Sequence, residues 1–344
     1  MLAFSIDYYG IFFGATQSVE LFCTYVCGHI IAEGNKPFKY SNIIHGYIYS
    51  FHMALFFIIS GILIGTQIED KVELEYIKNR THSCIQNLMV PYFLWSAIYF
   101  ILDNKSLSHD IYEWLLCTVT FLGRAPIWFL IALFWADIFA IDIIYIAKQK
   151  KNVVIVTIII FILSITFWKY YRQLSISSII VKYSMISLFR GLVCLLFVLV
   201  GYIASSTIIR NENKFITGIK LCISSLISFG TYVLFRTGNN LHTFSIENIY
   251  VFLVTGISGS CMILFFCKFI CEIINMKSLE WIGQHSLGIM CIHYTHLPFM
   301  QYATDICNHM GLDGGVIAFI ISFAFVFSSS ILGIKVLKKI SCRI

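Results

Sequence analysis

The chain has 344 residues, of which 58% are hydrophobic and only 12% are charged, about half the charged share of a typical globular protein. So few charges exclude a water-soluble fold, a coiled coil and a disordered regulator. The net charge of +6 comes from short basic clusters between apolar runs, which is typical of membrane-protein loops and not of a nucleic-acid-binding surface. Because the apolar runs are continuous, the composition predicts an all-α, polytopic membrane helix bundle, not a barrel of alternating strands.

Ten apolar runs are long enough to cross a bilayer, which requires ~17–25 residues. A further run at 111–122 is too short and carries Glu113, so we expect one short re-entrant or interfacial helix there. The longest loop, 66–83, is too short for a soluble domain, which predicts a single membrane domain over residues 1–344. The predicted spans are 11–31, 47–65, 84–102, 126–147, 152–168, 186–209, 216–235, 246–271, 281–300 and 314–334.

The basic residues predict the orientation of the bundle. With ten spans, both termini lie on one side, and 15 of the 24 Lys and Arg residues fall on that side against 8 on the other. The remaining one, Arg190, begins the span at 186–209. The excess predicts a multi-pass protein with both termini in the cytoplasm.

Two histidines form the strongest candidate site. His29 lies near the outer end of the first predicted span, and His52 lies early in the second, so the two imidazoles are expected at similar depth. Tyr25 lies four residues before His29 and shares its helical face. An ionisable group inside a span costs ~2.5–3.5 kcal/mol on insertion scales, which favours function for this pair. The alternative is that each histidine bonds a neighbouring helix and stabilises packing.

Other polar groups in the spans have simpler interpretations. Arg190 is typical of a side chain that extends to the membrane interface, with substrate lining as the alternative. Asp137 and Asp142 are five residues apart on one predicted helix, so they face different directions. His293 and His296 share a face, but no further ligands are evident, and the 12 cysteines include no CxxC pair. We therefore expect no metal site.

Five short motifs occur in an order that resembles one known family. Residues 49–65 read YSFHMALFFIISGILIG, similar to the second-span signature FHMPLFFFLSG of the acyltransferase-3 family of membrane O-acyltransferases. The others are CGHI at 27–30, VPYFLW at 90–95, APIWFLIALFW at 125–135 and LEWIGQHSLGIMCIHY at 279–294, which resemble the family's GH, VPY-W, PxWFL and IGxxSLxIYxxH segments. The resemblance covers nearly the whole chain and is closest to the fucose-acetylase-like branch of bacterial surface-sugar pathways.

The resemblance implies a multi-pass protein of the bacterial inner membrane with about ten spans. It also implies an acyl-CoA donor, usually acetyl-CoA, used as a co-substrate from the cytoplasm, with no bound cofactor expected. The implied acceptor is a sugar hydroxyl of a polysaccharide or lipid-linked precursor, and membrane lipid is expected to surround the protein. By resemblance His29 is the catalytic histidine, His52 supports it and the late histidine maps onto His293. Trp128, in the PIWFL segment, lines the acyl or sugar path in this interpretation, or else is an interfacial aromatic anchor.

The chain departs from the family in two places. Members usually carry basic residues just before the VPY segment, thought to hold the CoA phosphates, whereas here the nearest fixed charges are Lys78 and Arg80. We therefore expect these two to bind the acyl donor. Residues 1–20 also diverge, because Asp7 and Gly10 lie further from the histidine than their family counterparts. Either departure is compatible with an impaired or inactive enzyme.

Two chemical routes remain open for a histidine acting on a thioester. A neutral imidazole, with an unperturbed pKa of ~6.5, is suited to take the hydroxyl proton as general base, worth ~10²–10⁴-fold. In the second route, His29 carries the acyl group transiently.

Other functions fit the same membrane class. A transporter or flippase of lipid-linked sugars would use similar buried groups, but no span pair is visibly broken by Gly or Pro in corresponding halves. A polysaccharide polymerase usually carries one large outward loop, which this chain lacks. An inactive relic of the acyltransferase family is the third alternative.

Overall fold

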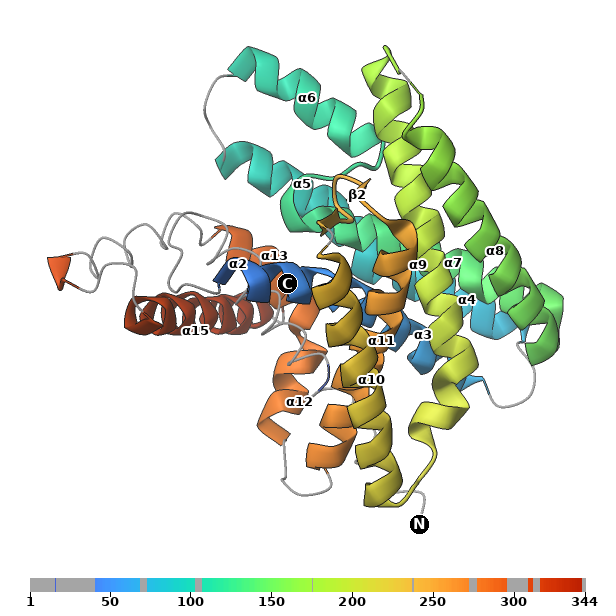
Figure 1. Cartoon of the computed structure of the whole chain (residues 1–344). Coiled ribbons are helices and arrows are strands. Elements are labelled where there is room, and N and C mark those ends of the chain that lie inside the picture. The colour runs from blue at the N-terminus through green and yellow to red at the C-terminus, as the bar shows by residue number, and fades with distance from the viewer. Residues whose placement is uncertain are drawn as a thin grey trace. The chain divides into compact units, whose positions relative to one another are not determined.

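Almost every residue that the structure describes lies in a helix (Figure 1). The computed structural model describes Thr16 and residues 41–68, 73–102, 107–174, 176–236, 238–271, 277–295, 309–311 and 316–341. The chain divides into two compact units. One comprises Met1–His52, Asn213–Arg236 and Cys261–Ile344, and the other Met53–Glu212 and Thr237–Ser260.

Within the described ranges, seven helices are long and apolar enough to cross a membrane, which confirms the helical membrane class. These are Ile43–Gln67, Leu74–Ile101, Trp128–Ala147, Lys150–Tyr171, Ile179–Ile209, Lys214–Phe235 and Ile249–Cys271. The predicted span 11–31 lies outside the described residues except for Thr16. The last predicted span, 314–334, overlaps α15 (Val316–Ser341). The count of ten stays a prediction.

The predicted continuous span over 281–300 differs from the structure. Its first part is divided at His285 into two short helices, α12 (Lys277–Gln284) and α13 (Ser286–Thr295). Nδ1 of the His285 ring is hydrogen-bonded to the Trp281 carbonyl at 2.7 Å. The His285 backbone N–H therefore donates to the Ile282 carbonyl and not to that of Trp281. Because the side chain replaces the backbone donor at that carbonyl, the regular i to i−4 ladder is interrupted.

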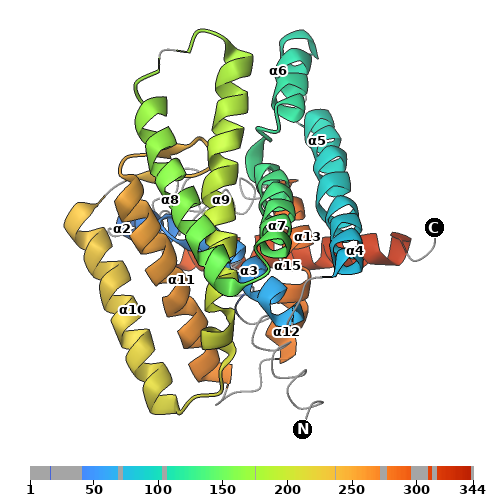
Figure 2. The ribbon, with the colours of Figure 1, turned by 90° about the vertical axis from the view of Figure 1, so that its right-hand side faces the viewer.

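The core of the larger unit is built around α9 (Ile179–Ile209), which packs against α7 (Trp128–Ala147) and α8 (Lys150–Tyr171) (Figure 2). Residues 53–67 of α3 (His52–Gln67) cross α9 where both helices carry a glycine. Small residues at such crossings let two membrane helices approach closely, and their van der Waals contact replaces the hydrophobic drive available in water.

The helix over Leu74–Ile101 consists of α4 (Leu74–Cys84), a π-helical turn η2 (Ile85–Met89) and α5 (Val90–Leu102). The π turn ends two residues before Pro91, whose ring lacks an N–H and would clash with the carbonyl four residues back, inside that turn. A wider turn at this point accommodates the proline without ending the helix. The short helix predicted at 111–122 is α6 (Leu107–Val119).

Two irregular segments follow these helices in the same unit. A turn over residues 120–124 leads through the 3₁₀ helix η3 (Ala125–Ile127) into α7. The segment before α11 (Ile249–Cys271) forms a small hairpin of β1 (Asn239–Asn240) and β2 (Ser245–Ile246), with Asn239 opposite Ile246. These two segments carry most of the site described below.

In the other unit, α2 (Ser41–Tyr49) packs against α10 (Lys214–Phe235) through two tyrosines. The Tyr47 hydroxyl donates to Ser228 Oγ at 3.1 Å, and the Tyr232 hydroxyl donates to the Ile43 carbonyl at 3.1 Å. The helices α13 and α15 also pack together, with Gly288 facing Ile334.

Candidate functional site

Of the two histidines predicted to form the site, the structure describes only His52. His29 and Tyr25 lie outside the described residues. His52 begins α3 and is 4% exposed, and its Nδ1 lies 3.1 Å from the Ile48 carbonyl. Because a carbonyl oxygen only accepts, Nδ1 carries the proton and Nε2 of the neutral ring is the acceptor. The side chain is therefore buried in one defined tautomer.

Two side-chain rings of α2, which the sequence did not single out, form a series of ring contacts with His52. The Tyr49 ring lies 4.7 Å from that of His52, and the His45 ring stacks on Tyr49 at 4.2 Å. Within the described part of the chain, His45 Nε2 is buried without a hydrogen-bond partner. The signal for this series was the i, i+4 spacing of His45 and Tyr49, which places them on one helical face.

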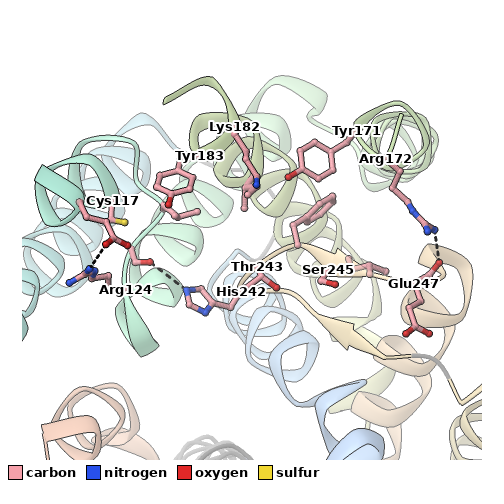
Figure 3. A pocket seen from close by; sticks show the side chains of 16 residues that line it. Cys117, Arg124, Tyr171, Arg172, Lys182, Tyr183, His242, Thr243, Ser245 and Glu247 are labelled. Atoms are coloured by element: carbon pink, nitrogen blue, oxygen red, sulfur yellow. Dashed lines mark hydrogen bonds and ion pairs between the residues drawn. The ribbon is translucent and has the colours of Figure 1, made fainter. Parts of the chain in front are cut away.

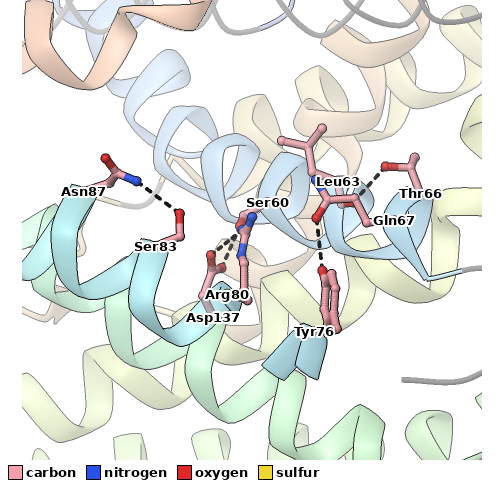
Figure 4. A network of polar contacts seen from close by, with 9 residues as sticks. All are labelled: Ser60, Leu63, Thr66, Gln67, Tyr76, Arg80, Ser83, Asn87 and Asp137. Carbon is pink, nitrogen blue, oxygen red and sulfur yellow. Dashed lines mark hydrogen bonds and ion pairs between the residues drawn. The ribbon is translucent and has the colours of Figure 1, made fainter. Parts of the chain in front are cut away.

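A buried ion pair links three helices of the larger unit (Figure 4). Asp137 of α7 is 2% exposed, accepts from Ser60 Oγ of α3 at 2.6 Å, and lies 2.9 Å from Arg80 Nη2 of α4. Arg80, one of the two predicted donor-binding residues, therefore points toward Asp137. Lys78, the other, is exposed on α4, as expected for residues two positions apart on a helix.

Arg190 does not extend into solvent, because protein encloses its side chain. Its side chain is completely buried and donates from Nη2 to the carbonyls of Phe121 (3.0 Å) and Leu122 (2.7 Å), and from Nη1 to that of His242 (3.1 Å). Its guanidinium also lies 4.8 Å over the Trp128 ring. Three carbonyls and one π face replace the water that a buried cation loses.

Trp128 is likewise enclosed by protein. Its side chain is buried, with Arg190 on its ring face and the His242 ring stacked on it at 5.7 Å and 14°. Trp128 begins α7 directly after Gly123 and η3; Gly123 has φ of +68°, and an added Cβ there would overlap the Trp128 backbone. The tight turn that places Trp128 therefore requires glycine.

His242, in the hairpin before α11, was not predicted, because it lies in a polar loop between spans. Its Nε2 lies 3.4 Å from the Gly123 carbonyl. Burial, reinforced by the positive charge of Arg190, lowers the pKa of His242 to about 4, although the Gly123 bond opposes the shift. At neutral pH the ring is therefore uncharged.

These loops surround a pocket of about 630 Å³ (Figure 3). That volume falls within the ~300–1,000 Å³ typical of small-molecule sites. The polar side chains of the lining come from α6, the turn before α7, the end of α8, the start of α9 and the hairpin. They include Glu113, Arg124, Tyr171, Arg172, Lys182, Tyr183, His242, Thr243, Ser245 and Glu247. Trp128 and Arg190 lie behind the His242 wall.

The predicted topology placed Arg124, Arg172 and Lys182 on the side opposite the termini, and the structure brings these three around one pocket. His293, the late histidine of the resemblance, lies in α13, and its side chain lies outside the described residues.

The comparison with known families agrees with the motifs. Residues 23–335 match the acyltransferase-3 family, described as an acyltransferase domain. No curated protein and no solved structure matches the chain. The match begins before His29 and ends within α15, so it covers most of the sequence and most of the helices. The chain therefore belongs to the acyltransferase-3 family and is a membrane acyltransferase.

Proposed function

We propose that the protein transfers an acetyl group from cytoplasmic acetyl-CoA to a sugar hydroxyl of a bacterial surface polysaccharide or its lipid-linked precursor. The observation that carries this proposal is the family match over residues 23–335, which includes the histidine motifs at 27–30 and 49–65. The motif wording supports assignment to the fucose-acetylase-like branch, and the excess of Lys and Arg on one side supports both termini in the cytoplasm. Acetyl-CoA acts as a co-substrate, and the reaction requires no bound cofactor.

The reaction needs a base, because a sugar hydroxyl is barely ionised at neutral pH. His29 takes the hydroxyl proton as the oxygen attacks the thioester carbonyl. The carbon–sulfur bond then breaks, and the imidazolium returns its proton to the departing CoA thiolate. If His29 instead carries the acetyl group, its ring nitrogen attacks the thioester, the carbon–sulfur bond breaks, and CoA leaves as the thiol with the ring proton. The sugar hydroxyl then attacks the acetyl-imidazole, the carbon–nitrogen bond breaks, and the hydroxyl proton passes to the freed imidazole.

His52 is suited to orient His29 or to bind the acceptor hydroxyl. Its bond to the Ile48 carbonyl fixes the proton on Nδ1, so the other ring nitrogen accepts hydrogen bonds. A fixed tautomer supports this role, since the other tautomer would present a donor in place of the acceptor at Nε2.

Lys78 and Arg80 are proposed to bind the CoA phosphates. Lys78 supplies an exposed charge on α4, whereas Arg80 is 22% exposed and shares its charge with Asp137. We therefore expect Lys78 to provide most of the electrostatic attraction and Arg80 to provide a fixed hydrogen-bond geometry.

The test is the acetate content of surface glycan, measured by proton NMR on cells that produce wild-type protein, His29→Ala, a control His309→Ala variant, or none. His309 is an exposed histidine. We expect an acetyl resonance with wild type and His309→Ala that is absent with His29→Ala, at equal membrane levels of the three proteins. Full acetylation by His29→Ala contradicts both chemical routes. Unchanged acetate with altered glycan amount or chain length favours the transporter or polymerase.

A further inference from the structure

The pocket of Figure 3 has an excess of unneutralised positive charge. Among the described residues, no carboxylate pairs with Lys182 or Arg172. Lys182 is exposed, and its ammonium points into the pocket. Arg172 donates to the backbone carbonyl of Glu247 at 3.0 Å and lies 5.2 Å over the Trp168 ring. Both contacts fix the guanidinium in place but leave its full charge uncompensated.

The two carboxylates of the lining do not cancel this charge. Glu113 is already paired with Arg124, with 3.2 Å between Oε2 and Nη2. The carboxylate of Glu247 extends away from the Arg172 guanidinium, toward Gly238, where an added Cβ would lie 3.0 Å from Glu247 Oε1. Lys182 and Arg172 are thus the lining cations that, among the described residues, no carboxylate pairs with.

Hydroxyl groups make up much of the remaining polar lining. Tyr171, Tyr183, Thr243 and Ser245 each contribute one to the pocket. Hydroxyls both donate and accept, and tyrosine rings offer apolar faces next to them. The volume is larger than a single inorganic ion needs. A ligand that matches hydroxyls, ring faces and two cations carries many hydroxyls and an anionic group.

We propose that this pocket binds an acidic sugar unit of the acceptor glycan, with the sugar carboxylate held by Lys182 and Arg172. The inference rests on the proposed acetyl transfer and names the class of acceptor. The uncharged His242 ring adds a hydrogen-bonding surface at the pocket wall. Arg190 joins the turn at 121–122 to the His242 segment, so the walls are formed before a ligand arrives.

The experiment measures binding of two matched probes to the full chain in phosphatidylcholine nanodiscs. One probe is a trigalacturonate, and the other is the same trimer after carboxyl reduction, which is neutral. The variants are Lys182→Gln, Arg172→Gln and the charge-keeping Lys182→Arg, with Lys169→Gln as the control. Lys169 is an exposed lysine at the end of α8 that does not line the pocket.

We expect wild type, Lys169→Gln and Lys182→Arg to bind the acidic trimer in preference to the neutral one. Lys182→Gln and Arg172→Gln should each weaken acidic-trimer binding by about tenfold or more, the loss expected for one charge-assisted hydrogen bond. The proposal is overturned if wild type binds neither trimer or both equally, or if Lys182→Gln binds as Lys169→Gln does. It is also overturned if phosphatidylglycerol in the nanodisc abolishes trimer binding and itself binds in a Lys182-dependent way, since the site then takes a lipid headgroup.

The binding assay separates this inference from the proposed function. His29→Ala should bind the acidic trimer as wild type does while transferring no acetyl group. Lys182-dependent binding without acetyl transfer in any variant would leave the pocket assignment standing and refute the proposed reaction. Acetyl transfer to glycan with no preference for the acidic trimer would refute the pocket assignment alone.

Discussion

Gly61 of α3 and Gly201 of α9 lie at the same helix crossing, each against the backbone of the other helix. A Cβ on Gly61 would overlap the carbonyl of Val198, and one on Gly201 would overlap the carbonyl of Ile58. Gly61 is also the last residue of the FFIISG part of the second-span motif. Helix packing thus explains the glycine of that motif, because any side chain there would separate two buried helices.

Replacing either glycine by alanine should destabilise the protein by about 3 kcal/mol, because backbone atoms cannot move aside as a side chain can. Gly191→Ala, also in α9, is the matched control, since nothing lies near an added Cβ there and helix propensity improves. Unfolding can be followed with a thiol-reactive dye, since the thiols of Cys84, Cys117, Cys194 and Cys267 are buried and form no disulfide. Equal unfolding midpoints for Gly61→Ala and Gly191→Ala would contradict the close approach of α3 and α9 at this crossing.

The Arg80–Asp137 pair should be far more costly to break than to replace. Arg80→Ala leaves the Asp137 carboxylate buried with Ser60 as its one remaining partner in the described part of the chain, which should cost about 3–5 kcal/mol. The double variant Arg80→Met with Asp137→Leu removes both charges and should lose much less. Asp142→Ala, an exposed acid on the same helix, serves as the control. Additive losses in the double variant would show that the pair is not coupled.

Arg190 should tolerate no substitution well, including a conservative one. Removing the guanidinium leaves the carbonyls of Phe121, Leu122 and His242 without these bonds, at about 1–3 kcal/mol for each buried group. Arg190→Lys keeps the charge but cannot reach the three carbonyls with one ammonium. We therefore expect Arg190→Lys to be less stable than wild type and more stable than Arg190→Met. Unfolding followed with the thiol-reactive dye ranks the stabilities of wild type, Arg190→Lys and Arg190→Met. A lysine variant as stable as wild type would mean that charge alone matters at this position.

Apolar length predicted the described spans well, because the cost of burying backbone and charge in lipid acts on each segment separately. The buried position of His52 follows from the same rule, whereas Arg80 was assigned to the loop at 66–83 and lies in α4. The pairing of Arg80 with Asp137 does not, since the two are 57 positions apart and only helix packing brings them together. Hydropathy also missed the break at His285, where one side-chain bond interrupts a helix whose composition is otherwise continuous.

The loops carried less information than the spans. Arg190 looked like an interfacial residue because hydropathy places it near a span end, but the turn over 120–124 and the hairpin cover it. The sequence did not indicate His242 as a site residue, since a polar loop has no hydrophobic periodicity and its position relative to the membrane cannot be read from hydropathy. The pocket depends on three loops meeting, and charge counting predicted only that they share a side.

The buried His242 ring should make stability depend on pH in a defined window. The pKa of His242 is about 4 in the folded protein and about 6.5 when solvated. Between pH 6.5 and pH 4, the ring therefore binds a proton in the unfolded chain but stays neutral in the folded chain. Stability contributed by the neutral ring is therefore complete above pH 6.5 and falls as the pH approaches 4, by ~3 kcal/mol in all. His242→Phe keeps a ring against Trp128 and cannot titrate, so its stability should fall less over this window, whereas the exposed control His309→Phe should follow wild type. Tryptophan fluorescence during denaturation at pH 7, 5.5 and 4 measures the difference without relying on thiolate chemistry, and identical pH slopes for wild type and His242→Phe would mean that the ring is solvated.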